Sequence, residues 1–331
     1  MIIQNIKLVN FRNHSQYELN FEQTTTLILG ENGWGKTSIL EAVYLGLQGK
    51  SFRAVDAEIL KRGEGFYRVE MNYFDGRKIV VGFDGTAKTF LVEEKKNRRL
   101  PKKNKYPVVL FLPSDLHLIS SSPSRRRDYF DRIFGQMEEN FGGFLSRYEK
   151  ALRQRNELLK NEDVSSGDLF SWNMMLAKYG VEIMRARRKF IDKINRRLTE
   201  VYRSIAKNED EIFLKLETEV DGLDEQGYLM RLEQNFQKDK YLGHTSFGVH
   251  RDDFVFYFNG KEAEGSASRG ETRSIILALK FVEAEMIFEV LRLKPVVLLD
   301  DVFSELDAGR RKCLVENFRD NQVIITSVEK V

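Results

Sequence analysis

One short stretch, LILGENGWGKTSILEA at residues 27–42, constrains the fold of this chain more than any other feature. An apolar run ends at Gly30, a polar glycine-rich turn follows, and Lys36 opens a segment with the apolar spacing of a helix. The turn matches G-x-x-x-x-G-K-[ST], in which glycines allow backbone N–H groups to converge on an anion at a helix N-terminus. We therefore predict a strand, a phosphate-binding loop and a helix, in that order.

The loop pattern assigns chemistry to its positions. Lys36 supplies a cation for the β- and γ-phosphates of a nucleotide, and the hydroxyl of Thr37 is suited to bind Mg²⁺. We expect ATP and Mg²⁺ as the ligands. The residues predicted to bind the nucleotide are Gly30, Glu31, Asn32, Gly33, Trp34, Gly35, Lys36, Thr37 and Ser38.

A second acidic element is expected beside the loop, and KPVVLLDD at residues 294–301 supplies it. Its apolar residues do not alternate with polar ones, which is typical of a strand buried on both faces. The strand ends in Asp300, predicted to hold Mg²⁺, and Asp301, predicted to polarise the attacking water. Asp301 and Lys36 are thus the predicted catalytic residues.

A second anion site is predicted at Ser268, Arg269, Gly270 and Glu271, which lead into a helix. One chain does not need two binding loops for one γ-phosphate. Two copies of the chain do need them if ATP lies between the phosphate loop of one copy and the Ser268 loop of the other, which would then act in trans as a signature loop. Ser304, Glu305, Leu306 and Asp307 follow the acidic strand and are predicted to form a D-loop. Trp34 is bulky for its place, and we interpret it as a contact or a steric limit at the interface between two copies.

The remaining sequence reads as strand-rich ends around a helical middle. Asp75-Gly76 and Asp84-Gly85 separate β-rich runs and predict two hairpins. Apolar spacing predicts one long helix over about 123–160 and a second that begins near an N-cap at Asp168, packed as a hairpin. We expect an α/β fold with one sheet assembled from both chain ends. The predicted divisions are 1–120, a helical insertion at 121–210, and 211–331.

Composition excludes several classes of protein. The single cysteine, Cys313, allows no intramolecular disulfide framework, and four scattered histidines give no zinc spacing. The N-terminus is not a signal peptide, and no apolar stretch is long enough to span a bilayer. We expect a protein of the reducing cytoplasm.

Net charge is only +3, so the position of the basic residues matters more than their number. A run predicted to contact DNA phosphates contains Lys95, Lys96, Arg98, Arg99, Lys102, Lys103 and Lys105. Arg125, Arg126 and Arg127 are further DNA-binding candidates, or stabilise the junction of the helical lobe. The segment from Arg185 to Lys189, Arg187 included, is predicted to be an exposed helix face. No interleaving of aromatic and basic residues indicates base stacking, so contact is expected with the DNA backbone.

With these motifs in order, the chain resembles ABC-type ATPases of the SMC and RecF group, and most closely the RecF family. The resemblance covers nearly the whole length. It includes the opening IKLVNFRNH, the Ser-Phe-Arg after the loop helix, FLPSDLHLISSSPSRRRDYFD, GVHRDDFVF, and LLDDVFSELDAGRRKCL. In related ATPases the residues at Arg12 and Asn13 lie near the nucleotide.

The resemblance implies an ABC-type ATPase head with an inserted helical lobe, acting in bacterial DNA repair. It implies ATP-dependent homodimerisation, slow DNA-stimulated hydrolysis, binding to gapped DNA at single-strand to double-strand junctions, and work with RecR and RecO to load RecA. The chain departs from the wider ABC pattern at Arg269 and Glu271, where many signatures read Gly and Gln. It also lacks a clear Q-loop glutamine, and Thr326-Ser327 stand where transporters carry a histidine.

Two alternatives remain open at this point. A small-molecule phosphotransferase would use the same loop but gives no reason for the Ser268 loop or for SELD at 304–307. An SMC-type chromosome organiser would need a long coiled-coil arm, and the helical middle is too short at about 1.5 Å per residue.

Overall fold

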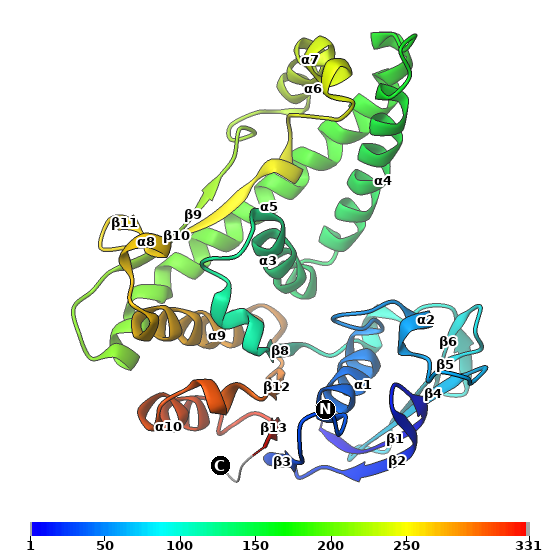
Figure 1. Cartoon of the computed structure of the whole chain (residues 1–331), viewed down its shortest axis with the longest axis vertical. Helices are drawn as coiled ribbons and strands as arrows, with labels where there is room; N and C mark the ends of the chain where they lie inside the picture. Colours follow the sequence, from blue (N-terminus) through cyan, green and yellow to red (C-terminus); the bar gives the residue numbers. More distant parts are fainter. Residues whose placement is uncertain (1, 329–331) are drawn as a thin grey trace. The chain divides into compact units, whose positions relative to one another are not determined.

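The computed structural model describes residues 2–328 (Figure 1). It divides into two compact units, Met1–Leu116 with Ile287–Val331, and His117–Met286. The predicted division therefore needs correction, because residues 211–286 group with the helical segment rather than with the C-terminal part of the ATPase lobe. The sequence shows that residues near 212–217 and 253–258 form strands, but it does not show which sheet they join.

The first unit contains two sheets where the sequence suggested one. A six-stranded antiparallel sheet has the order β2-β1-β4-β5-β6-β7. Its strands are β1 (Ile3–Phe11), β2 (His14–Asn20), β4 (Tyr67–Tyr73), β5 (Lys78–Phe83), β6 (Lys88–Val92) and β7 (Lys95–Asn97). Both Asp-Gly turns join antiparallel neighbours, β4 to β5 and β5 to β6, which confirms the predicted hairpins. β7 forms the first part of the basic run at residues 95–105, where no strand was predicted.

The second sheet of this unit is built from both ends of the chain, as predicted. Its order is β3-β13-β12-β8 and all its neighbouring strands are parallel. The strands are β3 (Thr25–Leu29), β8 (Val108–Phe111), β12 (Val296–Asp300) and β13 (Val323–Ser327). β8, β12 and β13 are buried along their whole length, which explains their uninterrupted apolar runs.

Helix α1 (Lys36–Gln48) lies between the two sheets and is buried on almost every side. Its apolar residues join the core that both sheets share. The loop that opens α1 is therefore fixed on a rigid support. The unit also contains α2 (Asp56–Ile59), α10 (Ala308–Asn317) and the short 3₁₀ turns η1 (Lys102–Asn104), η2 (Pro113–His117, reaching into the second unit) and η4 (Val302–Glu305).

The second unit is mainly helical, with a small sheet of order β11-β10-β9. Its strands are β9 (Ile212–Glu217), β10 (Asp253–Phe258) and β11 (Lys261–Glu262). Its helices are α3 (Pro123–Met137), α4 (Phe141–Leu159), α5 (Ser166–Ala206), α6 (Glu225–Gln234), α7 (Phe236–Leu242), α8 (Ala263–Ser266) and α9 (Arg269–Leu291), with η3 (Val249–Arg251). The unit boundary at 286/287 falls within α9.

Two helix predictions need correction here. The long helix expected over 123–160 is broken between Met137 and Phe141, just before Gly142 and Gly143, which disfavour a continuous helix. The second helix has its N-cap three residues earlier than predicted. Ser165 is the N-cap, and Asp168 is the N3 partner of a capping box with it. The predicted packing of the helices is present, because α4 and α5 lie side by side (Figure 1).

Buried charges of the second unit form ion pairs that the sequence did not reveal. Arg187 on α5 is only 2% exposed, so the prediction of an exposed helix face is wrong at this position. Its guanidinium donates to Asp131 at 2.7 Å and to Asp252 at 2.6 Å.

Within residues 2–328 no helix combines the length and apolarity that a membrane span requires.

Candidate functional site

The glycine-rich turn of residues 30–35 connects β3 to α1, as predicted. Gly35 has φ of 98°, and a Cβ at this position would lie 2.5 Å from the side chain of Asn13, so only glycine fits. The ammonium of Lys36 is buried and donates to the carbonyl oxygens of Gly30 at 2.7 Å and Glu31 at 3.1 Å. The lysine is therefore folded over its own loop.

A pocket of about 620 Å³ lies at this loop. It is large enough for a small ligand such as a nucleotide. The residues that line it come from the loop, from the β1–β2 turn, from the segment after α1 and from the end of β12: Arg12, Asn13, Asn32, Gly33, Gly35, Lys36, Thr37, Ser38, Arg53, Glu58, Leu60 and Asp301. Arg12 and Asn13, which the resemblance placed near a nucleotide, are thus part of the same pocket.

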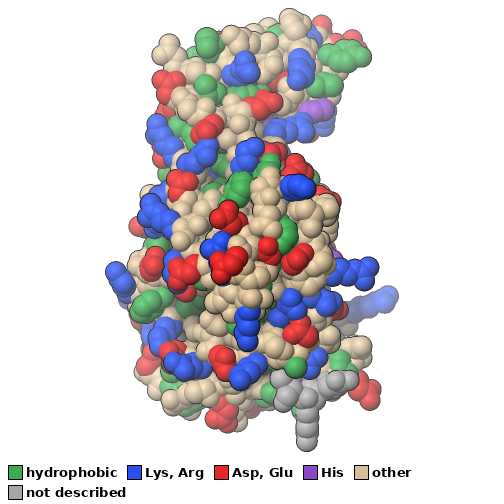
Figure 2. All heavy atoms as spheres, turned by 90° about the vertical axis from the view of Figure 1, so that its left-hand side faces the viewer, with side chains coloured by type: hydrophobic (Ala, Val, Ile, Leu, Met, Phe, Trp, Pro, Cys, Tyr) green, Lys and Arg blue, Asp and Glu red, His purple; other side chains and the backbone are tan. Residues whose placement is uncertain are grey.

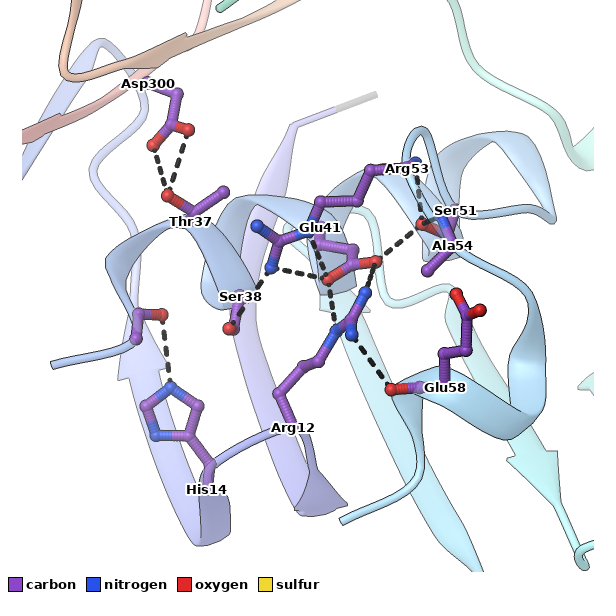
Figure 3. A network of polar contacts seen from close by, with 11 residues as sticks. Arg12, His14, Thr37, Ser38, Glu41, Ser51, Arg53, Ala54, Glu58 and Asp300 are labelled. Carbon is purple, nitrogen blue, oxygen red and sulfur yellow. Dashed lines mark hydrogen bonds and ion pairs between the residues drawn. The ribbon is translucent and has the colours of Figure 1, made fainter. Parts of the chain in front are cut away.

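Asp300 brings the second half of the predicted site to the loop. The hydroxyl of Thr37 lies 2.9 Å from both carboxylate oxygens of Asp300 (Figure 3). The buried hydroxyl of Thr326 lies 2.9 Å from the same carboxylate. Burial raises the pKa of Asp300, while the hydrogen bonds from Thr326 and Thr37 oppose this. Two hard oxygen donors therefore lie side by side at the start of α1, as Mg²⁺ coordination requires.

Asp301 has a left-handed backbone, with φ of 49°. Its backbone N–H donates to the hydroxyl of Thr326 at 3.0 Å, so Thr326 holds both aspartates. One carboxylate oxygen of Asp301 lies 3.7 Å from the ammonium of Lys36. Sequence reasoning noted Thr326 only as a departure from transporters and missed this supporting role.

Glu41 on α1 forms a buried network that sequence reasoning also missed. Its carboxylate is inaccessible to solvent and accepts two hydrogen bonds from Arg12, both at 2.8 Å, and two from Arg53, at 2.8 and 3.0 Å (Figure 3). The hydroxyl of Ser51 donates a fifth, at 2.6 Å. Burial acts to raise the pKa of Glu41, but the hydrogen bonds outweigh it and hold the pKa below its ordinary value.

This network holds the guanidinium groups of Arg12 and Arg53 at the pocket. Arg53 also donates to the hydroxyl of Ser38, at 3.4 Å, and Arg12 donates to the backbone carbonyl of Glu58. The Ser-Phe-Arg segment at 51–53 was the available sequence signal for Arg53. That signal gave no indication of its partner, twelve residues earlier in the chain.

Trp34 is about half exposed and rests on its own chain. Its ring packs edge-on against Tyr17 and His14, with centroid distances of 5.7 and 6.1 Å. Asn13 donates to the Trp34 carbonyl at 3.1 Å. The β1–β2 hairpin therefore supports the loop from one side. The interpretation of Trp34 as an interface residue stays a prediction.

The predicted signature loop belongs to the second compact unit. Ser268 is exposed and precedes α9. Its backbone N–H donates to the Glu271 carboxylate at 2.6 Å, and the Glu271 N–H donates to the Ser268 hydroxyl at 3.3 Å. This is a capping box, so the glutamate that departs from the common signature has a local structural role. Arg269 is exposed and Gly270 is partly exposed.

The predicted D-loop directly follows Asp301. Ser304 donates its hydroxyl to the Asp301 carbonyl at 2.7 Å, and Leu306 is buried. Asp307 is the N-cap of α10, and Glu305 is exposed. These residues therefore connect the end of β12 to the next helix.

The predicted DNA-binding residues differ in exposure. All seven basic residues between 95 and 105 are exposed, as is Arg125. Arg126 contradicts its prediction as a DNA contact, because it is buried and donates to both carboxylate oxygens of Asp253, at 2.7 and 2.6 Å. Arg127 is partly buried and donates to the Asp252 carbonyl. On the face shown in Figure 2, basic and acidic side chains are interspersed and form no separate basic patch.

Comparison with known proteins decides the family. Residues 1–166 match the AAA ATPase domain family. The DNA replication and repair protein RecF of Alkaliphilus oremlandii is 34% identical over 99% of this chain and 93% of its own length. The chain belongs to the RecF family.

Solved structures agree with this assignment. A structure of the recombination mediator protein RecF with ATP, described in the RecFOR pathway, superposes with a TM-score of 0.88 at 30% identity. That match covers 99% of this chain and 92% of the other. An SMC head bound to the C-terminal winged-helix domain of ScpA shares 14% identity and a TM-score of 0.54, which shows the fold alone. The predicted ABC-type head with a mixed α/β fold is thereby confirmed, within the RecF family.

Proposed function

We propose that this RecF-family chain is an ATP-binding DNA repair protein whose ATP-driven pairing with a second copy controls its hold on DNA. The observation that supports ATP as the ligand is the contact of Thr37 with Asp300 at the mouth of the loop. It supplies the oxygen donors of a magnesium–nucleotide site beside Lys36. The solved relative described with ATP supports the same ligand.

The residues of the pocket fit ATP with Mg²⁺. The described residues contain no cluster of three or more acidic, histidine or cysteine side chains that would hold a metal ion alone. This agrees with Mg²⁺, which proteins usually bind through one or two side chains together with substrate phosphates and water. Thr37 and Asp300 would hold the ion, while Lys36 and the loop N–H groups would bind the phosphates.

Hydrolysis would require a base near the γ-phosphate, and Asp301 is the candidate. ATP supplies the phosphoanhydride bond that is broken when water attacks. Asp301 would orient that water and accept its proton, and the Thr326 contacts fix the backbone of Asp301. Arg12 and Arg53, held by Glu41, would add positive charge at the pocket. We propose slow, DNA-stimulated hydrolysis that acts as a switch.

The Ser268 loop gives the reason to propose a dimer. Its exposed hydroxyl lies at the N-terminus of the 23-residue helix α9, where the Glu271 carboxylate accepts from the Ser268 N–H, and the loop belongs to a different unit from the phosphate loop. In a dimer, the Ser268 loop of one copy would complete the nucleotide site of the other. Trp34, half exposed within the phosphate loop, would then contact the partner.

Dimerisation with and without ATP tests the proposal, measured by light scattering coupled to size-exclusion chromatography. Wild type should become dimeric with ATP and Mg²⁺. Lys36→Arg should abolish ATP-dependent DNA binding, Ser268→Arg should bind ATP but stay monomeric, and Asp301→Asn should accumulate as the ATP dimer. If Ser268→Arg still dimerised on ATP, the shared site would be wrong. If Trp34→Ala dimerised like wild type, Trp34 would have no interface role.

We further propose that the exposed cations between residues 95 and 105 contact DNA phosphates, and that the protein acts on gapped DNA with RecR and RecO to load RecA. Several neighbouring cations that neutralise DNA phosphates release counterions, which gives affinity for DNA of any sequence. This would explain why the basic residues are clustered in this segment. Replacing Lys102, Lys103 and Lys105 together by glutamine should weaken DNA binding. The slope of log affinity against log salt concentration should decrease by the equivalent of up to about three phosphate contacts. An unchanged salt slope, measured by fluorescence anisotropy, would remove this segment from the interface.

A further inference from the structure

The six-stranded sheet of the first unit carries a hollow of about 430 Å³ on its outer side, around β4, β5 and β6. Its inner side packs on the core with α1. Residues from the four strands β4 to β7 and from the adjoining turns line the hollow, among them Phe66, Arg68, Val80, Gly82, Leu91 and Lys96. None of these residues belongs to the nucleotide pocket.

The floor of the hollow is a glycine in the middle of a strand. Gly82 on β5 pairs with Arg68 on β4 and with Thr89 on β6. Glycine weakens a strand and often marks a place where a ligand or another backbone comes close. A Cβ at Gly82 would meet only the Thr89 hydroxyl, at the ordinary distance of 3.6 Å. Packing within the chain therefore does not require glycine here, and approach by a ligand explains it better.

Apolar side chains form the walls. Phe66, directly before β4, is 49% exposed, and Leu91 on β6 is 41% exposed. Leu91 pairs across the strands with Val80, which lies in the base of the hollow. Single exposed apolar residues are common, but here an aromatic ring and an aliphatic side chain line the same concave site.

Positive charge stands at one rim. Lys96 on β7 pairs with Leu91 and lines the hollow, and Lys95, Arg98 and Arg99 are its neighbours in the chain. All four are exposed, and within the described chain none of them forms an ion pair. Arg68 at another side is neutralised by Glu70, at 3.1 Å. Of these four cations Lys96 lines the hollow, at the β7 rim next to the apolar walls, and the other three flank it in the chain.

We infer that this hollow binds an unpaired nucleotide of single-stranded DNA. The base would lie over Gly82 against Phe66 and Leu91, and the neighbouring phosphates would contact Lys96 and the cations beside it. Single-strand binding sites combine a stacking surface with a positive groove in this way. A paired and stacked base of a duplex cannot enter, so the hollow would recognise the single-stranded side of a gap.

This inference rests on the proposed DNA-binding function, and it adds base stacking to the expectation that DNA contact is mostly with the backbone. The aromatic residue and the cations are 30 positions apart in the sequence, so their interleaving becomes visible only when β4 and β7 join one sheet. An apolar segment of a protein partner is the competing occupant. The unpaired cations favour DNA, because phosphates would neutralise them.

Three variants of the full chain, assayed with ATP and Mg²⁺, test the hollow. Phe66→Ala removes the stacking wall, and Gly82→Val fills the floor with a residue that strands accept. Phe74→Ala is the matched control, because Phe74 is 44% exposed in the β4–β5 turn of the same sheet but does not line the hollow. Binding of a labelled oligo-dT strand and of a duplex of equal length is measured by fluorescence anisotropy at two salt concentrations.

We expect Phe66→Ala and Gly82→Val to weaken single-strand binding about 5- to 150-fold, the effect of losing one stacked base. Duplex affinity and the salt slope should stay at wild-type values because no charge is removed, and Phe74→Ala should behave as wild type. Unchanged single-strand affinity in Phe66→Ala, or an equal loss on duplex, overturns the inference. Thermal unfolding of each variant separates this loss from misfolding, and Phe66→Ala remains informative if Gly82→Val is unstable.

Two further outcomes distinguish failure of the proposed DNA-binding function from failure of the assignment of the hollow to DNA. If wild type binds neither DNA, the proposed DNA-binding function fails before the hollow is tested. If the variants bind both DNAs like wild type but lose binding to purified RecR or RecO, the hollow is a protein-docking site and the assignment to DNA is wrong.

Discussion

The hydroxyl of Thr37 lies 2.9 Å from both carboxylate oxygens of Asp300, although 263 positions separate these residues in the chain. The contact forms because β3, which leads into the loop of Thr37, and β12, which ends at Asp300, belong to one parallel sheet with β13 between them. The carboxyl ends of parallel strands lie at one edge, where α/β proteins bind their ligands.

Asp300→Asn should weaken Mg²⁺-dependent ATP binding without unfolding the protein. Asparagine keeps the shape and the hydrogen bonds with Thr37 and Thr326 but removes the charge that holds the cation. We expect the affinity for ATP in the presence of Mg²⁺ to decrease at least about tenfold, because even the loss of a residue that only supports a metal ligand has an effect of this size. Calorimetric titration of ATP with and without Mg²⁺ measures it. Asp320→Asn, at an exposed position, is the control; equal Mg²⁺ dependence in the two variants would contradict the role of Asp300.

The parts of the site that the sequence predicts are those that local spacing defines. The loop from Gly30 to Thr37 carries its own geometry, because its glycines, lysine and helix start are consecutive. Asp300 was predictable because a strand without alternation must be buried between neighbours, and its end must reach the edge of the sheet. The strand-rich chain ends predicted a sheet assembled from both of them, but not that its strands would all be parallel.

Charge pairing could not be predicted in this way. Arg187 and Arg185 stand in one basic segment, yet Arg187 is buried and Arg185 is exposed. Which face of α5 is buried depends on the residue that follows η3 and on α3, which supply Asp252 and Asp131 from distant positions. The independent antiparallel sheet was missed for a related reason, since strand character does not specify the partner strand.

Glu41→Gln should reduce ATP affinity by loosening Arg12 and Arg53 at the pocket. A neutral amide cannot accept four hydrogen bonds from two guanidiniums, so both side chains lose their fixed positions. We expect KM for ATP to rise about tenfold with a smaller change in kcat, and a loss of about 1–3 kcal/mol in the free energy of unfolding. Steady-state ATPase kinetics and urea unfolding measure the two effects.

Glu58→Gln is the matched control for Glu41. It removes another carboxylate near Arg12 but keeps the backbone carbonyl that accepts from that arginine. Its KM should stay close to the wild-type value. If both variants raised KM equally, general loss of negative charge rather than positioning by Glu41 would explain the result.

Arg187→Ala should destabilise the protein by about 3–5 kcal/mol, because it leaves the carboxylates of Asp131 and Asp252 without their buried cation. Arg185→Ala is the internal control. Arg185 is exposed and pairs with Glu182 on the same helix, a contact that contributes at most about 0.5 kcal/mol. Urea unfolding of both variants compares them, and similar losses would show that the buried triad has no special role.

His250, in the GVHRDD segment, connects two buried tyrosines to the chain. One ring nitrogen, Nδ1, lies 2.8 Å from the Tyr148 hydroxyl, and Nε2 lies 3.1 Å from the Thr245 carbonyl. The Tyr148 hydroxyl in turn lies 2.9 Å from that of Tyr228. Because a carbonyl can only accept, Nε2 carries the proton and Nδ1 accepts from Tyr148. Burial, assisted by Arg251 and Arg127, lowers the pKa of His250 from 6.5 to about 4.

Because the pKa of His250 is lower in the folded chain than in the unfolded chain, the free energy of unfolding should decrease as the pH is lowered. The unfolded chain binds a proton at His250 near pH 6.5 but the folded chain only near pH 4, so the contribution is complete above 6.5 and declines between these values. At about 1.36 kcal/mol per pH unit, wild type should lose roughly 2 kcal/mol more than His250→Gln between pH 7 and pH 5. Urea unfolding at several pH values measures the difference. His117→Gln, at an exposed histidine, should follow wild type, and parallel curves for wild type and His250→Gln would refute the assignment.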